Sequence, residues 1–174
     1  HNWQNVCAAL TAFWQVSQNV EAAHKVLTSF SGLPFRIELR RKVRGISYYN
    51  DSFSSAPQAT IAAIETIEAP KVLILGGLDR GLDLSELAET LKKHGGDIRK
   101  VLVVGAAADR IAEALQAGGF ASFVKCTAKD MPTIVRHATY VARPGDAVVL
   151  SPGFPSFDMF KNFTRFYNTK FIKK

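Results

Sequence analysis

The sequence predicts an α/β protein with a mostly parallel, Rossmann-like sheet that carries helices on both faces. Three short runs, 71–75, 101–104 and 147–150, are almost wholly apolar, as is typical of parallel strands buried on both faces. Glycine or turn residues follow these runs, and amphipathic segments of helical periodicity separate them. This alternation favours crossover connections and a covered parallel sheet. Nearly half of the residues are apolar, enough for a core.

Two helices are expected before this domain, at residues 2–17 and 20–29. Apolar residues of the first fall on one helical face: Val6, Leu10, Phe13 and Trp14. Gly32 and Pro34 break the pattern, which places a domain boundary near residues 30–36. We therefore expect two domains, 1–33 and 34–174. The chain starts at His1 within a helix-start pattern, so we expect it to be part of a longer polypeptide.

The first part of the second domain should hold a strand pair and a helix. Residues 36–39 and 46–50 have the composition of strands joined around Gly45. Ser55 is expected to be the N-cap of the next helix, with Pro57 in its first turn. The apolar face of that helix would be formed by Ile61, Ile64 and Ile67.

The remaining elements follow from caps and glycine stops. Asp83 should be the N-cap of a helix, because it forms a capping-box pattern with Glu86, and this helix should end at Gly95 and Gly96. Further helices are expected at 107–117, from Asp130 to about 141, and from 157 to about 167. A short strand is expected at 122–126.

Charge and cysteine content narrow the function classes. The net charge is +7, with a basic cluster from Arg36 to Arg44, but no aromatic signature of a nucleic-acid module accompanies it. No apolar run approaches the ~18 residues of a membrane helix. Cys7 and Cys126 lack metal-type spacing and are expected to be reduced thiols. We expect a monomeric, cytoplasmic protein that binds small molecules and binds neither nucleic acid nor membrane.

Two loops could bind ligands at the carboxyl ends of strands, where open α/β sheets place their sites. Residues 76–81 bring glycines for close approach of an anion and Arg80 for a carboxylate, although the spacing is not G-x-G-x-x-G. Residues 50–55 offer Asp51 for ribose hydroxyls and serines for an anion. Each loop also fits a plain turn or cap. The sequence contains no phosphate-loop motif, no metal-ligand spacing and no nucleophilic triad, so we expect no catalytic or metal residue in this chain.

Residues 151–163 form the most informative stretch, because two hydroxyls, an acid, a base and aromatics follow a buried strand. They read Ser-Pro-Gly-Phe-Pro-Ser-Phe-Asp-Met-Phe-Lys-Asn-Phe. A tight turn with a packed aromatic helix is the alternative, since Phe157, Phe160 and Phe163 recur at helical spacing.

The order of these motifs resembles the Mur ligase family, in its UDP-N-acetylmuramoylalanine–D-glutamate ligase branch. The matching stretches run from His-Asn-x-x-Asn through Gly-Leu-Pro-x-Arg-x-Glu, Tyr-Asn-Asp-Ser and Leu-Gly-Gly-x-Asp-Arg-Gly to Ser-Phe-Asp-x-Phe-Lys-Asn-Phe. The resemblance implies that 1–33 ends the central ATPase domain and that 34–174 is the glutamate-binding domain. It also implies an acyl phosphate made with ATP and Mg²⁺, which glutamate's amine attacks, with the metal ligands in upstream domains.

The resemblance assigns site residues to positions of this sequence. Those expected at the nucleotide are Asn2, Asn5, Arg36 and Asp51. Those expected at glutamate or the muramoyl substrate are Ser55, Arg80, Ser156 and Phe163.

Several positions depart from the family pattern. Phe53 and Ala56 replace a lysine and an asparagine, Gly153-Phe154-Pro155 replaces Ala-Cys-Ala, and the tail after Asn162 lacks the usual Glu-Arg-Gly run. Two alternatives therefore stay open: a related ligase that adds L-glutamate or another amino acid, and a non-catalytic nucleotide-binding module. We expect the chain by itself to be inactive, because the phosphate loop would lie upstream.

Overall fold

The computed structural model describes residues 2–156 and 158, which belong to two compact units, 1–33 and 34–174. The first unit holds α1 (Asn2–Val16) and α2 (Val20–Ser29), as predicted. Asn19 caps α2, because its side-chain oxygen accepts a hydrogen bond from the amide of Ala22 at 2.9 Å. No described residue of this unit is buried, so the unit has no core of its own.

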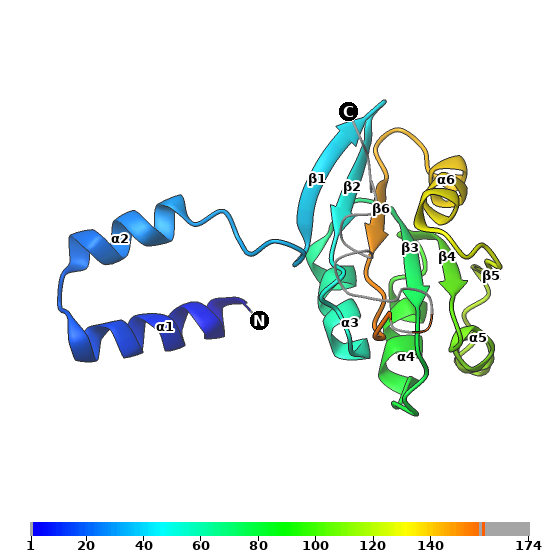
Figure 1. Cartoon of the computed structure of the whole chain (residues 1–174), viewed down its shortest axis with the longest axis horizontal. Helices are drawn as coiled ribbons and strands as arrows, with labels where there is room; N and C mark the ends of the chain where they lie inside the picture. The colour runs from blue at the N-terminus through cyan, green and yellow to red at the C-terminus, as the bar shows by residue number, and fades with distance from the viewer. Residues whose placement is uncertain (1, 157, 159–174) are drawn as a thin grey trace. The chain divides into compact units, whose positions relative to one another are not determined.

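The described strands of the second unit form one six-stranded sheet in the order β1-β2-β6-β3-β4-β5 (Figure 1). Only the β1–β2 pair is antiparallel, so the predicted mostly parallel sheet is confirmed. The strand bounds are β1 Glu38–Val43, β2 Ile46–Asn50, β3 Lys71–Gly76, β4 Ile98–Val104, β5 Phe123–Lys125 and β6 Ala147–Leu150.

Helices cover both faces of this sheet (Figure 1). On one face, α3 (Pro57–Thr66), α4 (Ser85–Lys93) and α5 (Ala108–Ala117) bury their apolar sides against residues such as Leu73 and Val103. On the other face, α6 (Met131–Val141) packs on Ile74, Leu102 and their neighbours. The continuous apolar runs of β3, β4 and β6 supply side chains to both cores, which explains their composition.

Three local predictions were wrong. The first strand begins at Glu38 and runs to Val43, because Arg41 and Lys42 continue the pairing with β2. Ala56 occupies the N-cap of α3, so Ser55 is not the cap. Leu84 occupies the N-cap of α4, so Asp83 is not the cap, although it accepts hydrogen bonds from the Ser85 amide and hydroxyl. The helix expected at 157–167 lies outside the described residues.

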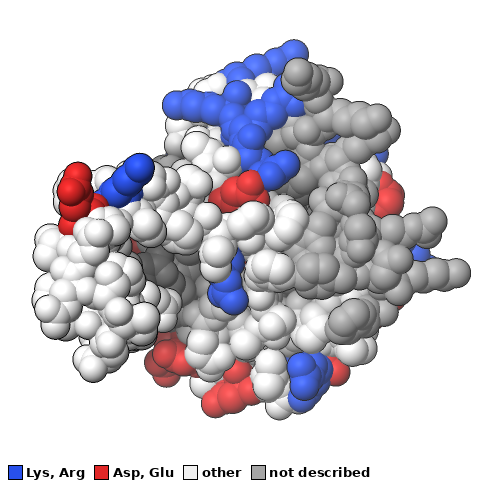
Figure 2. Space-filling model, turned by 60° about the vertical axis from the view of Figure 1, so that its left-hand side comes forward, with Lys and Arg blue, Asp and Glu red and all other residues white. Residues whose placement is uncertain are grey.

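Much of the positive charge lies away from the carboxyl ends of the parallel strands. The register places Lys42 opposite Ser47, which pairs with Ala147 at the start of β6. Figure 2 shows basic side chains gathered at the top, where the β1–β2 hairpin turns in Figure 1. The basic cluster therefore lies mainly over the edge opposite to the candidate ligand loops. Among the described residues, no helix is long and apolar enough to cross a membrane.

Candidate functional site

The loops after β2, β6, β3 and β4 meet at one edge of the sheet, which we call the ligand edge. The Asp51 amide donates to the carbonyl of Leu150 at 2.8 Å, which joins the loops after β2 and β6. The Gly76 amide donates to the Pro152 carbonyl at 2.8 Å, and the Ala107 amide donates to the Gly77 carbonyl at 2.9 Å. Backbone bonds thus connect all four loops, and the edge is a fixed platform.

Asp51 is the buried centre of this platform and is only 3% exposed. Its Oδ1 accepts a hydrogen bond from the Ile37 amide at 3.0 Å, and its Oδ2 accepts from the hydroxyls of Ser54 and Ser151, the latter at 2.7 Å. Ser151 also contacts the hydroxyl of Thr60 at 3.1 Å.

Burial raises the pKa of the Asp51 carboxyl, although the two serine hydroxyls, the Ile37 amide and Arg36 act in the opposite direction. The carboxylate therefore ties the loops after β2 and β6 together, because its oxygens already accept bonds from both loops and from the segment before β1. A ligand hydroxyl would have to share or displace these internal donors.

The segment before β1 contacts the loop after β2. The Phe53 amide donates to the Phe35 carbonyl at 3.2 Å, and the two rings meet edge to face with centroids 5.5 Å apart. The guanidinium of Arg36 lies 5.8 Å from the centre of the Phe53 ring. Phe53 therefore lies beside Arg36 and takes part in an aromatic contact.

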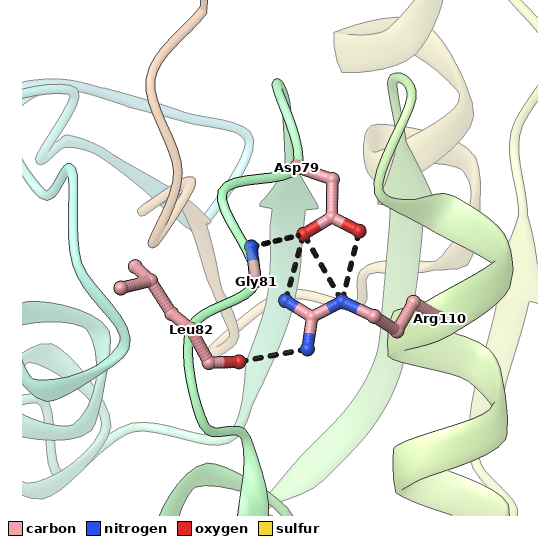
Figure 3. A network of polar contacts seen from close by, with 4 residues as sticks. All are labelled: Asp79, Gly81, Leu82 and Arg110. Carbon is pink, nitrogen blue, oxygen red and sulfur yellow. Dashed lines mark hydrogen bonds and ion pairs between the residues drawn. The ribbon is translucent and has the colours of Figure 1, made fainter.

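The loop after β3 is held by Arg110, a residue of α5 that the sequence did not single out (Figure 3). Arg110 Nε lies 3.0 and 2.9 Å from the two carboxylate oxygens of Asp79, and its Nη2 lies 2.8 Å from Oδ1. Its Nη1 donates to the Leu82 carbonyl at 2.7 Å, while the Gly81 amide donates to Asp79. The hydrogen bond from Arg110, followed by that from Gly81, lowers the pKa of Asp79.

The turn after β6 is built into the domain core. Phe154 is 1% exposed and belongs to the core cluster under α3, α4 and α5. The Leu78 amide donates to the Pro155 carbonyl at 2.7 Å, so this turn lies directly against the loop after β3. Farther along, Asp158 accepts a hydrogen bond from the Ala106 amide at 2.8 Å, close to the start of α5. The Ser-Phe-Asp motif thus contributes a structural contact through its acid.

The predicted site residues occupy different environments. Arg80 is exposed, and its guanidinium forms no ion pair with any residue that the structure describes. Ser55 is exposed and Ser156 is partly buried, whereas Arg36 lies close enough to Asp51 to affect its pKa. Asn5 is exposed on α1 in the other unit. The Asn2 side chain and Phe163 lie outside what the structure describes.

The structure therefore brings Arg36, Asp51 and Ser151 together and places Arg80 on the neighbouring loop after β3. Sequence reasoning missed Arg110, because nothing local marks its bond to a residue 31 positions away. It also missed the role of Ser151, although the hydroxyl directly after an apolar strand was a usable signal. Within residues 2–156 and 158, no group of three or more His, Cys, Asp or Glu could hold a metal ion.

Residues 35–154 match the family described as "Mur ligase, glutamate ligase domain". The chain belongs to this family. The match includes all six strands, the loops after β2 and β3, and Arg110, and it leaves out both ends of the chain.

Curated relatives extend the similarity to nearly the whole chain. UDP-N-acetylmuramoylalanine–D-glutamate ligase of Symbiobacterium thermophilum is 37% identical over 94% of the chain and 35% of the relative. The protein with the same name in Pelotomaculum thermopropionicum is 40% identical, with the same two coverages. The chain thus spans about a third of the length of these relatives.

Solved structures support the fold. The D-alanyl-D-alanyl-adding ligase of Acinetobacter baumannii matches with a TM-score of 0.68 at 16% identity, over 100% of this chain and 37% of that one. MurF ligase from Thermotoga maritima, solved in complex with ADP, matches with a TM-score of 0.60 at 20% identity, over 84% and 33%. A folylpolyglutamate synthase/dihydrofolate synthase from Yersinia pestis has a TM-score of 0.61 at 21% identity, over 87% and 35%.

Proposed function

We propose that this chain is part of an ATP-dependent amide ligase that adds D-glutamate to UDP-N-acetylmuramoyl-L-alanine in peptidoglycan precursor synthesis. The observation that carries the proposal is the exposed guanidinium of Arg80 on the Gly-Gly loop at the ligand edge, which forms no ion pair with a residue that the structure describes. A guanidinium binds a carboxylate through two parallel hydrogen bonds, and glutamate brings such carboxylates. The names of the relatives, at 33–40% identity, support the same reaction.

In this proposal, the chain provides two walls of a site that upstream domains complete. Asp51 on the loop after β2 and Arg36 in the segment before β1 would contact the nucleotide. Asn2 and Asn5 are the further residues that we assign to nucleotide binding. Arg80 on the loop after β3, with Ser156 and Phe163 beyond β6, would face glutamate and the muramoyl substrate. Ser55, which follows β2, would face the same substrates. Residues 1–33 would end the central ATPase domain, and 34–174 would be the glutamate domain.

The reaction balances as an activation followed by an amide bond. The terminal carboxylate of the acceptor attacks the γ-phosphorus of ATP and gives an acyl phosphate and ADP. Glutamate's amine then attacks the acyl carbon and expels phosphate. ATP with Mg²⁺ supplies the activation, and the described residues contain no metal cluster, so its ligands would come from upstream. We propose a cytoplasmic enzyme, where ATP is supplied and where Cys7 and Cys126 stay free thiols.

The test uses the full-length enzyme with ATP, UDP-N-acetylmuramoyl-L-alanine and each glutamate enantiomer. Turnover with D-glutamate is expected; turnover with L-glutamate alone would instead support the related ligase that the fold match to folylpolyglutamate synthase also fits. Arg80→Ala should raise KM for glutamate about 30-fold or more, because loss of one partner of a charge pair costs about 2–5 kcal/mol. KM for ATP should stay within about twofold, and Arg80→Lys should be milder.

Lys42→Ala is the matched control, because it removes an exposed positive charge over the opposite edge of the sheet. Its glutamate kinetics should equal those of the unaltered enzyme. If Arg80→Ala behaved like Lys42→Ala, or impaired ATP binding instead, the assignment of the loop after β3 would be wrong.

A further inference from the structure

Arg110 reaches the loop after β3 from a rigid helix. It lies in the first turn of α5, and that helix buries Ile111 and Leu115 in the core. Near the start of α5, Asp158 binds the amide of Ala106. The backbone that carries Arg110 is therefore held by elements outside the loop that its side chain contacts.

The contacts of Arg110 bracket Arg80. Its Nε and Nη2 bind Asp79, directly before Arg80, and its Nη1 binds the carbonyl of Leu82, two residues after it (Figure 3). The Gly81 amide closes the turn by donating to Asp79 at 2.9 Å. The backbone on both sides of Arg80 is thus held, while the Arg80 guanidinium makes no ion pair in the described part of the chain.

Charge explains why this arrangement suits a carboxylate ligand. Asp79 is the acid nearest to Arg80 in sequence, and a free Asp79 carboxylate would compete with a substrate carboxylate for that guanidinium. Arg110 binds both oxygens of Asp79, so the competitor is already paired. We propose that Arg110 is a positioning residue: by holding Asp79 and Leu82 it fixes the loop and leaves Arg80 free to bind glutamate. This inference rests on the proposed function.

A contribution to folding stability does not by itself explain why Arg110 is paired with Asp79. Surface ion pairs contribute little to folding, and α5 offers a comparison in the neighbouring pair of Asp109 and Lys125. The Asp109 side chain is 82% exposed, whereas those of Arg110 and Asp79 are 34% and 35% exposed. Arg110 also makes a hydrogen bond to the loop backbone, which the neighbouring pair does not.

The experiment measures KM for glutamate, KM for ATP, kcat and the melting temperature in the full-length enzyme. Arg110→Ala should raise KM for glutamate about 10- to 100-fold, as expected when a binding group is misplaced by about 1 Å, with KM for ATP nearly unchanged. Arg110→Lys should fall between, because it keeps one contact to Asp79 but cannot reach Leu82 as well. Asp109→Ala, which breaks the exposed pair on the same helix, should leave every value unchanged.

The double variant Asp79→Ala/Arg110→Ala separates positioning from a merely structural role. If a freed Asp79 competes for Arg80, removal of Asp79 should recover part of the glutamate affinity that Arg110→Ala loses. A double variant as impaired as Arg110→Ala, or more so, would overturn the competition argument. A normal glutamate KM in both Arg110→Ala and Arg110→Lys would overturn the proposal as a whole.

Arg80→Ala distinguishes the two levels of inference. If Arg80→Ala raises KM for glutamate and Arg110→Ala does not, only the positioning role fails. If Arg80→Ala has no effect, the proposed glutamate site itself is wrong. If Arg110→Ala fails to fold, Arg110→Lys replaces it. The glutamate KM of Arg110→Lys is then compared with that of the double variant Asp79→Ala/Arg110→Lys.

Discussion

Gly77 allows a close approach between the loop after β3 and the turn after β6, so Gly77→Ala tests whether that approach is required. Its φ is +153°, and an added Cβ would lie 2.3 Å from the backbone oxygen of Pro155 and 3.2 Å from the Cβ of Phe154. Neither contact can relax by a side-chain rotation, since one partner is backbone and the other is the first carbon of a buried residue. The substitution must push the loop after β3 away from the turn after β6.

The magnitude follows from the contacts that would be strained or lost. An unfavourable backbone conformation costs about 1–3 kcal/mol. Loss of the hydrogen bond from Leu78 to Pro155 adds about 0.5–1.5 kcal/mol. The free energy of unfolding should therefore fall by about 2–4 kcal/mol, which lowers the melting temperature of a protein of this size by about 4–16 °C.

Thermal melting followed by circular dichroism measures this, with Gly96→Ala as the matched control. Gly96 lies in an exposed turn, unlike the buried Gly77, and no atom lies within 4 Å of a Cβ built there. Gly96→Ala should therefore melt within about 2 °C of the unaltered protein. Equal melting temperatures for the two variants would show that the loops can separate without cost, and would refute the fixed platform.

Two further predictions concern acids at opposite edges of the sheet. Because the pKa of Asp51 is raised in the folded state above its ordinary value of 3.8, its contribution to stability should be largest below pH 3.8 and should be lost as pH rises through the higher folded pKa. Urea titrations from pH 4 to 7 should show Asp51→Asn gaining stability relative to the unaltered protein across that window, and a difference that does not vary with pH would contradict this. Asp146, which is 2% exposed, accepts bonds from Arg99 Nε at 3.3 Å and from the Arg143 amide at 2.8 Å, so Asp146→Ala should lower the free energy of unfolding by about 1–3 kcal/mol. In the full-length enzyme its KM for glutamate and ATP should stay unchanged; a raised KM would mean that the edge opposite to the ligand loops affects the site.

Patterns that act over a few residues predicted most of the fold. The last strand was expected at 147–150 and is found there, because an apolar run buried on both faces is unambiguous once turns bound it. The prediction misplaced the edge strand β1, because a strand with one solvated side and basic residues at 40–42 lacks that apolar signal.

The site was predictable only in part, for a related reason. Asp51 and Arg80 follow strands, so sequence order alone puts them at the ligand edge. The partner of Asp79 could not be predicted, because Arg110 meets it only after the crossover from β3 through α4 to β4 brings α5 beside the loop. Likewise, the bond between Ser151 and Asp51 joins residues 100 positions apart. Roles that depend on tertiary proximity leave no mark at a fixed spacing.

The antiparallel direction of β1 has a mechanical consequence. Because Glu38 lies opposite Asn50, the chain enters the domain at the ligand edge, and residues 35–37 form a short segment between Pro34 and the hydrogen bond to Asp51. Phe35 and Ile37 have φ values of +65° and +45°, each costing about 1–3 kcal/mol, so the backbone of this segment is strained. Two hydrogen bonds hold the strained segment. The Glu38 carboxylate accepts one from the Phe35 amide at 3.0 Å, and the Asp51 carboxylate accepts one from the Ile37 amide at 3.0 Å. A displacement of the chain at Pro34 would act first on these two hydrogen bonds, and so on the backbone that carries Arg36.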